Sequence, residues 1–236
     1  MKKYLFSVLL LLLSFAAAAQ QPAEDSAGEG KLYIGAGLTN LGYHIYYEEP
    51  KSSGAIRSGY FHPISLNFGY KVNERIRVQA GLAYGWSKDS GEWSPGSADT
   101  LLYEDYSRTR VVAVPVSGQL VLFKAFRRFP IYGTATLMPA FGSTQAKSTE
   151  TRHGVITSTE GKDRGMNVFA TAGLGFNYKI SNRFTGYLEY LFFKTNLTGK
   201  NSFHHDWNQF ATKSQQMYWS LSLGVKYRLR QLNLAQ

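Results

Sequence analysis

The sequence predicts an all-β protein, an eight-stranded antiparallel up-and-down β-barrel that crosses a membrane. Three observations support this fold class. Eight segments alternate apolar residues with small or polar ones, short and long connections alternate along the chain, and the last segment has aromatic residues near both ends. Alternation with a period of two is typical of a strand with one apolar face. A closed barrel satisfies every backbone hydrogen bond within its own wall, so it can cross lipid.

The first residues predict an export signal. Two lysines follow Met1, an apolar stretch covers residues 4–15, and four alanines at 16–19 offer a site to signal peptidase. We expect cleavage after Ala19, so that residues 1–19 are the signal peptide. The apolar stretch is too short for a membrane helix, which needs about 20 residues. Residues 20–30 are polar and rich in small side chains, which indicates a flexible lead-in.

The composition narrows the partners. The chain has no cysteine, which excludes a lipoprotein anchor, a disulfide framework and a cysteine-ligated metal. Its formal net charge is +10, which falls to +8 once Lys2 and Lys3 leave with the signal peptide. Such an excess favours either nucleic acid or an anionic membrane surface. An exported chain rarely meets nucleic acid, so we predict contact with membrane lipids and no nucleic-acid partner.

The connections between the eight segments predict the topology. The segments lie at residues 32–39, 64–70, 76–86, 112–122, 131–141, 168–180, 184–192 and 219–229. Short connections at 71–75, 124–130 and 181–183 alternate with long hydrophilic ones at 40–60, 87–108, 142–165 and 194–215. Outer-membrane barrels have short periplasmic turns and longer extracellular loops. We therefore expect one barrel over residues 31–230, a basic periplasmic rim and a short tail at 231–236.

A soluble lipocalin-like barrel is the alternative with the same number of strands. Its apolar faces would point inward, and the glycines and threonines of the other face would lie on the surface. The aromatic residues near the strand ends and the pattern of the last strand favour the membrane barrel instead.

The last strand and several inner repeats resemble known outer-membrane proteins. Ser222, Gly224, Tyr227 and Leu229 resemble the C-terminal signal that the outer-membrane assembly machinery reads. The whole mature chain resembles small outer-membrane β-barrel proteins of the OmpX, OmpW and OmpA-membrane-domain kind. The repeats at 80–84 and 172–176, and Val114-Pro115 before a basic turn, resemble the broad family that includes PorT-like proteins.

This resemblance implies a bacterial outer-membrane location and a role in envelope structure, adhesion, binding of lipopolysaccharide or a partner, or secretion. The members of such families differ in function, so the fold alone does not settle the activity.

The inward faces predict a filled lumen. Eight strands enclose a space about wide enough for side chains, and inward tyrosines face inward glycines. We therefore predict no porin. Glu189 is the one carboxylate expected on an inward strand face, and a buried carboxylate needs a partner. Arg77 and Lys226 are the candidate cations, in a structural role rather than in gating.

Arg108 and Arg110 continue the outward row of the fourth segment past the apolar band. A tilted strand needs about 9 to 11 residues to cross the bilayer, so we expect both guanidiniums at the outer headgroup level. There they could bind lipopolysaccharide phosphates bidentately. Ordinary snorkelling residues are the alternative.

Two prolines break the rule that strand interiors avoid proline. Pro115 and Pro139 fall inside the fourth and fifth segments, at nearly equal distances from the turn between them. We expect a single ladder that lacks donors on both sides. The favoured interpretation is a bulge that bends the wall, and the alternative is a lateral opening for an apolar ligand.

Catalysis has little support in the sequence. His204 and His205 beside Asp206, with Ser202 nearby, are the one cluster that resembles the sites of outer-membrane lipid A acyltransferases and deacylases. A triad needs mutual hydrogen-bond reach, and adjacent loop residues seldom share a direction. We predict a monomeric, non-enzymatic barrel with no catalytic residue, cofactor or metal. A lipid-modifying enzyme or a lateral conduit for small apolar ligands is the alternative.

Overall fold

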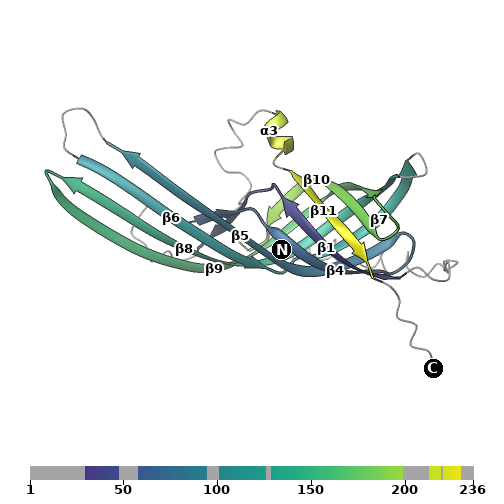
Figure 1. Ribbon diagram of the computed structural model, residues 1–236. Helices are drawn as coiled ribbons and strands as arrows, with labels where there is room; N and C mark the ends of the chain where they lie inside the picture. The colour runs from purple at the N-terminus through teal and green to yellow at the C-terminus, as the bar shows by residue number, and fades with distance from the viewer. Residues whose placement is uncertain are drawn as a thin grey trace, which may run out of the picture.

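Figure 1 shows the computed structural model, which describes residues 30–47, 58–94, 101–125, 129–198, 213–218 and 220–229. The predicted signal peptide at 1–19, the lead-in up to residue 29 and the tail at 231–236 lie outside the described residues. Among the described residues, no helix is both long enough and apolar enough to cross a membrane.

Eight strand positions form a closed wall. In chain order they are β1 (Leu32–Thr39), β4 (Ile64–Lys71), β5 (Ile76–Trp93), β6 (Leu101–Ala113) with β7 (Val116–Ala125), β8 (Phe129–Arg152), β9 (Val155–Lys179), β10 (Phe184–Asn196) and β11 (Leu221–Arg228). Strands β6 and β7 share one position, because both pair with β5 and with β8. Each position pairs antiparallel with the next, and β11 pairs with β1. The predicted eight-stranded antiparallel barrel is confirmed.

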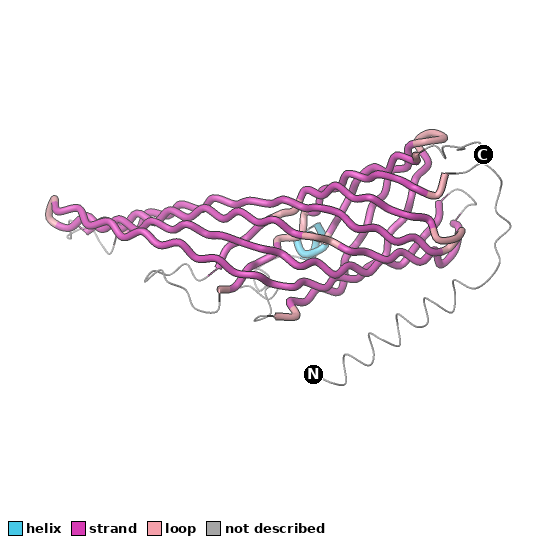
Figure 2. Tube along the Cα trace, turned by 90° about the horizontal axis from the view of Figure 1, so that it is seen from below, coloured by secondary structure: helices cyan, strands magenta, loops and turns pink. Residues whose placement is uncertain are grey.

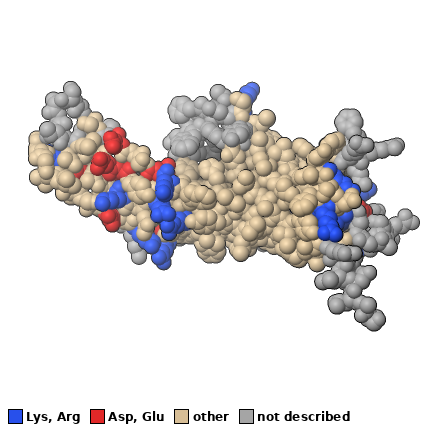
Figure 3. Space-filling view, viewed as in Figure 1, with Lys and Arg blue, Asp and Glu red and all other residues tan. Residues whose placement is uncertain are grey.

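The apolar faces of the strands point outward. Leu66 and Leu82 are 64% and 65% exposed on the outer wall, while their neighbour Asn67 is buried in the lumen. In lipid, outward apolar side chains and inward polar ones are the stable arrangement. Figure 3 shows the result, a broad zone without charged side chains between two groups of Lys and Arg side chains. The soluble barrel with an apolar interior is therefore excluded.

Two of the predicted long loops are wrong, because the strands continue through them. Residues 143–152 of β8 pair with 155–164 of β9 and with 101–110 of β6, which in turn pairs with β5 as far as Trp93. These segments are rich in serine and threonine, and threonine fits a pleated sheet well. Only His153 and Gly154, with φ of 49° and 79°, connect β8 to β9. Such two-residue turns match the twist of a hairpin, and Figure 2 shows the long taper that results.

The first predicted loop, at 40–60, folds back as a hairpin. Strands β2 (Tyr43–Tyr46) and β3 (Ser58–Phe61) pair with each other in a separate two-stranded sheet. Their side chains contact inward residues of the wall rather than solvent. In the fourth predicted loop, the described residues include one short helix, α3 (Lys213–Tyr218).

Two strands carry a register shift that the period-two pattern did not predict. The pairing of β7 shifts between Val121 and Phe123, and that of β10 shifts between Tyr190 and Phe193. At each shift two consecutive apolar residues, such as Phe192 and Phe193, are exposed on the outer wall. An inserted residue breaks the alternation in this way and re-aims the side chains that follow.

Candidate functional site

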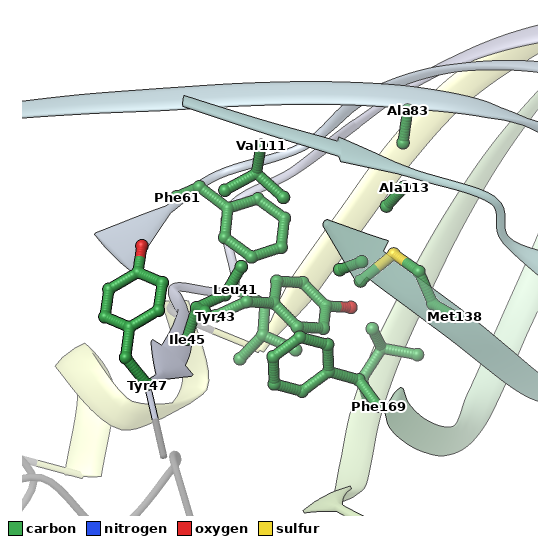
Figure 4. Close-up of a cluster of buried hydrophobic side chains, with 12 residues drawn as sticks. Leu41, Tyr43, Ile45, Tyr47, Phe61, Ala83, Val111, Ala113, Met138 and Phe169 are labelled. Atoms are coloured by element: carbon green, nitrogen blue, oxygen red, sulfur yellow. The ribbon is translucent and has the colours of Figure 1, made fainter. Parts of the chain in front are cut away.

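The β2–β3 hairpin occupies the extracellular half of the lumen. Ile45 and Phe61 are fully buried, and the Tyr43 ring lies 5.3 Å from the Phe61 ring and 5.1 Å from that of Phe169 on β9. Figure 4 shows these rings packed together with Val111 and other wall residues. Aromatic packing of this kind excludes water and adds stability beyond simple burial.

Polar contacts fix the hairpin in place. The Asn167 side chain on β9 exchanges two hydrogen bonds with the backbone of Tyr46, at 3.1 and 3.0 Å. The Tyr47 hydroxyl shares a hydrogen bond of 2.7 Å with Thr144, which also bonds to Thr109 at 2.8 Å. Burial is the main cause that raises the pKa of Tyr47, so its hydroxyl stays protonated. The hairpin is therefore held by hydrogen bonds as well as by apolar contact.

Inward glycines make room for this hairpin. A Cβ atom on Gly142 would lie 2.4 Å from Ile45, and one on Gly85 would lie 2.6 Å from Phe61. Lower in the lumen, a Cβ on Gly224 would lie 2.6 Å from the Tyr187 ring. Large inward side chains thus face positions that no larger residue could occupy.

Glu189 lies in the periplasmic half of the lumen, within a hydrogen-bonded cluster. Its carboxylate accepts hydrogen bonds from Tyr132 and Gln119, both at 3.0 Å. Gln119 in turn accepts a bond of 2.9 Å from the ammonium group of Lys226. In place of the expected direct ion pair, a glutamine bridges the two charges, because Gln119 on β7 offers both a donor and an acceptor. Arg77 lies opposite Gln119 in the ladder and forms no ion pair with a described carboxylate.

Three tyrosine rings surround the buried ammonium group of Lys226. Its nitrogen lies 4.8 Å from the ring centre of Tyr187, 5.5 Å from that of Tyr132 and 5.6 Å from that of Tyr33. Ring faces attract a cation at such distances, most strongly where water is excluded. This arrangement stabilises a charge that would otherwise be costly to bury.

Arg108 and Arg110 belong to a larger group of outward cations. The ladder places Arg108 opposite Lys88 and Gln145, and Arg110 opposite Trp86 and Ser143. Adjacent on β9 are Lys162 and Arg164, opposite the same two β8 residues. We call this group the cationic belt; its members are Lys88, Arg108, Arg110, Lys162 and Arg164. None of them forms an ion pair with a carboxylate that the structure describes.

The cationic belt adjoins the apolar zone. The next ladder position toward the periplasm carries Tyr84, Val112, Phe141 and Met166, all exposed on the outer wall. Acidic residues occur beyond the belt, where Lys147 pairs with Glu160 at 3.5 Å. Figure 3 shows the band of Lys and Arg between the uncharged zone and a mixed acidic and basic zone. Cations that end an apolar wall in this way lie where lipid headgroups begin.

The two prolines lie in a wall without an inserted residue. Pairing runs from Ala113 with Ala140 to Val116 with Leu137 without a change of register, so no bulge is present between them. Val114 donates to the Pro139 carbonyl at 2.9 Å, and Gly81 donates to the Pro115 carbonyl at 3.0 Å. Opposite residues exchange both bonds in such pairs. Each proline therefore removes one donor from a different ladder, rather than both from the same one.

The residues of the assembly signal lie on β11 beside β1. Ser222 and Gly224 face the lumen, where Ser222 bonds to Thr39 at 3.2 Å. Tyr227 accepts a hydrogen bond of 3.2 Å from Arg183, and the amide of Leu229 donates to Leu32 at 2.9 Å. They thus lie at the seam that closes the barrel.

The candidate catalytic cluster at Ser202, His204, His205 and Asp206 lies outside the described residues. Within the described part of the chain, no group of three or more histidine or acidic side chains could hold a metal ion. Sequence reasoning missed Gln119 and the β2–β3 hairpin. The signal for the hairpin was present, because residues 43–47 are mostly aromatic or aliphatic.

Comparison with known proteins identifies the family. A model described as the outer membrane protein β-barrel domain matches residues 7–228. The chain belongs to this family. Membership places this outer membrane β-barrel protein in the bacterial outer membrane, as the sequence predicted. No curated protein sequence matches the chain.

Solved structures with similarity to this outer membrane β-barrel protein include two bacterial proteins. Ail, the attachment invasion locus protein of Yersinia pestis, is 12% identical, with a TM-score of 0.27, over 86% of this chain and 99% of Ail. A second structure of Ail, in complex with the heparin analogue sucrose octasulfate, is 14% identical, with a TM-score of 0.30 and the same coverage. CarO of Acinetobacter baumannii is 13% identical, with a TM-score of 0.31, over 85% of this chain and 98% of CarO.

Proposed function

We propose that this protein is a non-enzymatic, monomeric barrel with a filled lumen that binds lipopolysaccharide through its outer wall. The cationic belt carries this proposal. Its five side chains lie on four adjacent strands, directly beyond the apolar zone, and have no described carboxylate to neutralise them. Guanidinium groups bind phosphate through paired hydrogen bonds. The phosphates of lipid A would supply the missing negative charge at this height.

The extracellular sheet beyond the belt is the part available to other partners. Strands β5, β6, β8 and β9 continue past the wall formed by the other strands. A role in envelope structure, adhesion or secretion would use this sheet. No described residue favours the alternative of a lipid-modifying enzyme.

The test removes the two arginines of β6. We expect Arg108→Gln with Arg110→Gln to lower the amount of lipopolysaccharide that co-purifies in mild detergent by about tenfold or more, since each charge-assisted hydrogen bond contributes about 1.5–3 kcal/mol. Lipid A phosphate per protein is measured by mass spectrometry. The matched control is Lys147→Gln with Arg152→Gln, which removes the same charge from β8 beyond the belt. Equal retention in both variants would contradict the proposal.

A further inference from the structure

The periplasmic mouth of the barrel contains a second, separate concentration of positive charge. A pocket of about 60 Å³ opens there, beside the short turns. Six of the residues that line it are cationic: Lys31, Lys71, Arg77, Arg183, Lys226 and Arg228. The remaining lining residues are a glycine, a tyrosine and a threonine, so no carboxylate lines the pocket.

The existing contacts leave this pocket with excess positive charge. Lys71 pairs with Glu74 at the exposed rim, and Lys226 is linked to Glu189 through Gln119. Arg77 lies directly opposite Lys71 in the β4–β5 ladder, and like charges in this arrangement destabilise a sheet. Arg77 has no hydrogen bond or ion pair to any residue that the structure describes.

The position of the pocket restricts what can reach it. Tyr33, Arg77, Thr185 and Lys226 line it from inward faces of four strands, so the pocket opens along the barrel axis and not through the lipid-facing wall. A soluble anion from the periplasm can enter, whereas a phospholipid headgroup in the bilayer would have to leave its leaflet. The volume suits one phosphoryl-sized group.

We propose that this pocket binds a soluble phosphate-class oxyanion at the periplasmic mouth. The anion would accept hydrogen bonds from the Arg77 guanidinium and neutralise the cations around it. The pocket and the cationic belt lie at opposite ends of the barrel, so this inference is independent of lipopolysaccharide binding.

The test uses the full-length mature protein in a phosphate-free maltoside detergent at constant ionic strength. Inorganic phosphate is titrated while its ³¹P resonance and the thermal midpoint of the protein are followed. We expect saturable binding, and a loss of affinity of about tenfold or more in Arg77→Gln, which loses a charge-assisted contact. The matched control is Arg75→Gln, which removes an exposed arginine from the same turn outside the pocket and should bind as the native protein does.

Three further arms keep the result decisive. Arg228→Gln tests the same pocket if Arg77→Gln does not fold, and it too should weaken binding. A titration with sodium chloride alone should show no saturation. Nanodiscs with anionic phospholipid but no free phosphate should leave the thermal midpoint of Arg77→Gln and of Arg75→Gln equally shifted from that of the native protein. Absence of saturable phosphate binding, equal binding by the two turn variants, or an effect seen only with the lipid would overturn the proposal.

Discussion

At the scale of single residues, the lumen shows how one polar side chain lets two charges share a buried space. Gln119 donates to Glu189 and accepts from Lys226, so neither charge depends on a direct partner. Tyr132 completes the coordination of the carboxylate. Buried charges of this kind are tolerated only when every group is hydrogen-bonded, and this cluster meets that condition for both ions.

Glu189→Gln should lower the thermal midpoint of the barrel without creating conductance. The variant removes the only carboxylate of the cluster and leaves Lys226 with no negative charge nearby, at a cost of about 1–3 kcal/mol. Thermal unfolding in detergent micelles measures the loss. Glu189→Gln combined with Lys226→Met should cost less than the sum of the two single changes, since they share one network. An unchanged midpoint together with new conductance would instead indicate gating.

The alternation of the sequence was sufficient to assign most side chains of the candidate site to the inner or outer face. Glu189, Lys226 and Arg77 face inward, and Arg108 and Arg110 outward, because parity along a strand decides the face. The Gln119 bridge was not predictable, because it depends on the register between strands that are far apart in the sequence. The other members of the cationic belt were missed for the same reason.

At the scale of elements, the prolines show that a ladder can lose a donor without losing its register. The carbonyl groups of Pro115 and Pro139 both accept hydrogen bonds, one from β5 and one from β6. Pairing on either side keeps the same count of residues. The wall is therefore weakened at two neighbouring points but stays continuous.

Pro115→Val with Pro139→Val should give two new amides that exchange slowly with deuterium. Each new ladder bond contributes about 0.5–1.5 kcal/mol, but loss of the stiff proline costs about 0.4–1 kcal/mol through the unfolded chain. Hydrogen exchange at residues 115 and 139 is therefore a sharper measure than stability. Fast exchange at both amides, or loss of lipopolysaccharide binding in this variant, would support the lateral opening.

The strands were predictable and their extensions were not. Residues 76–86 have a clean apolar row, which sets the membrane-spanning part of β5. From residue 87 onward both faces are polar, and a polar segment reads equally well as a loop or as an exposed strand. Pairing with β6 decides between them. The β2–β3 hairpin was assigned to a loop because its apolar residues have no lipid-facing row to continue.

At the scale of the whole molecule, two separate groups of side chains occupy the lumen. The β2–β3 hairpin lies in the extracellular half, and the Glu189 cluster lies in the periplasmic half. They come from different strands and share no hydrogen bond among the described residues. Passage through the barrel would require both to move.

Replacing residues 42–62 with a short glycine and serine linker should therefore not produce a pore. The deletion removes the contacts of Ile45 and Phe61 and should lower the thermal midpoint, because large apolar side chains each contribute about 2–5 kcal/mol in a packed core. Conductance in planar bilayers should stay at the background level. Adding Gln119→Ala and Tyr132→Ala to the deletion should open the path. Conductance from the hairpin deletion alone would show that the Glu189 cluster does not close the lumen.

The long β8–β9 hairpin determines what an approaching particle meets first. From Ser143, beside the cationic belt, to Arg152 the β8 strand rises about 30 Å along its own direction. The turn at His153 and Gly154 thus stands well outside the headgroups on a stiff, fully paired ribbon. An antibody or a phage would reach this tip before it reached any lipid. The most exposed part of the molecule is consequently also the part whose sequence the barrel constrains least.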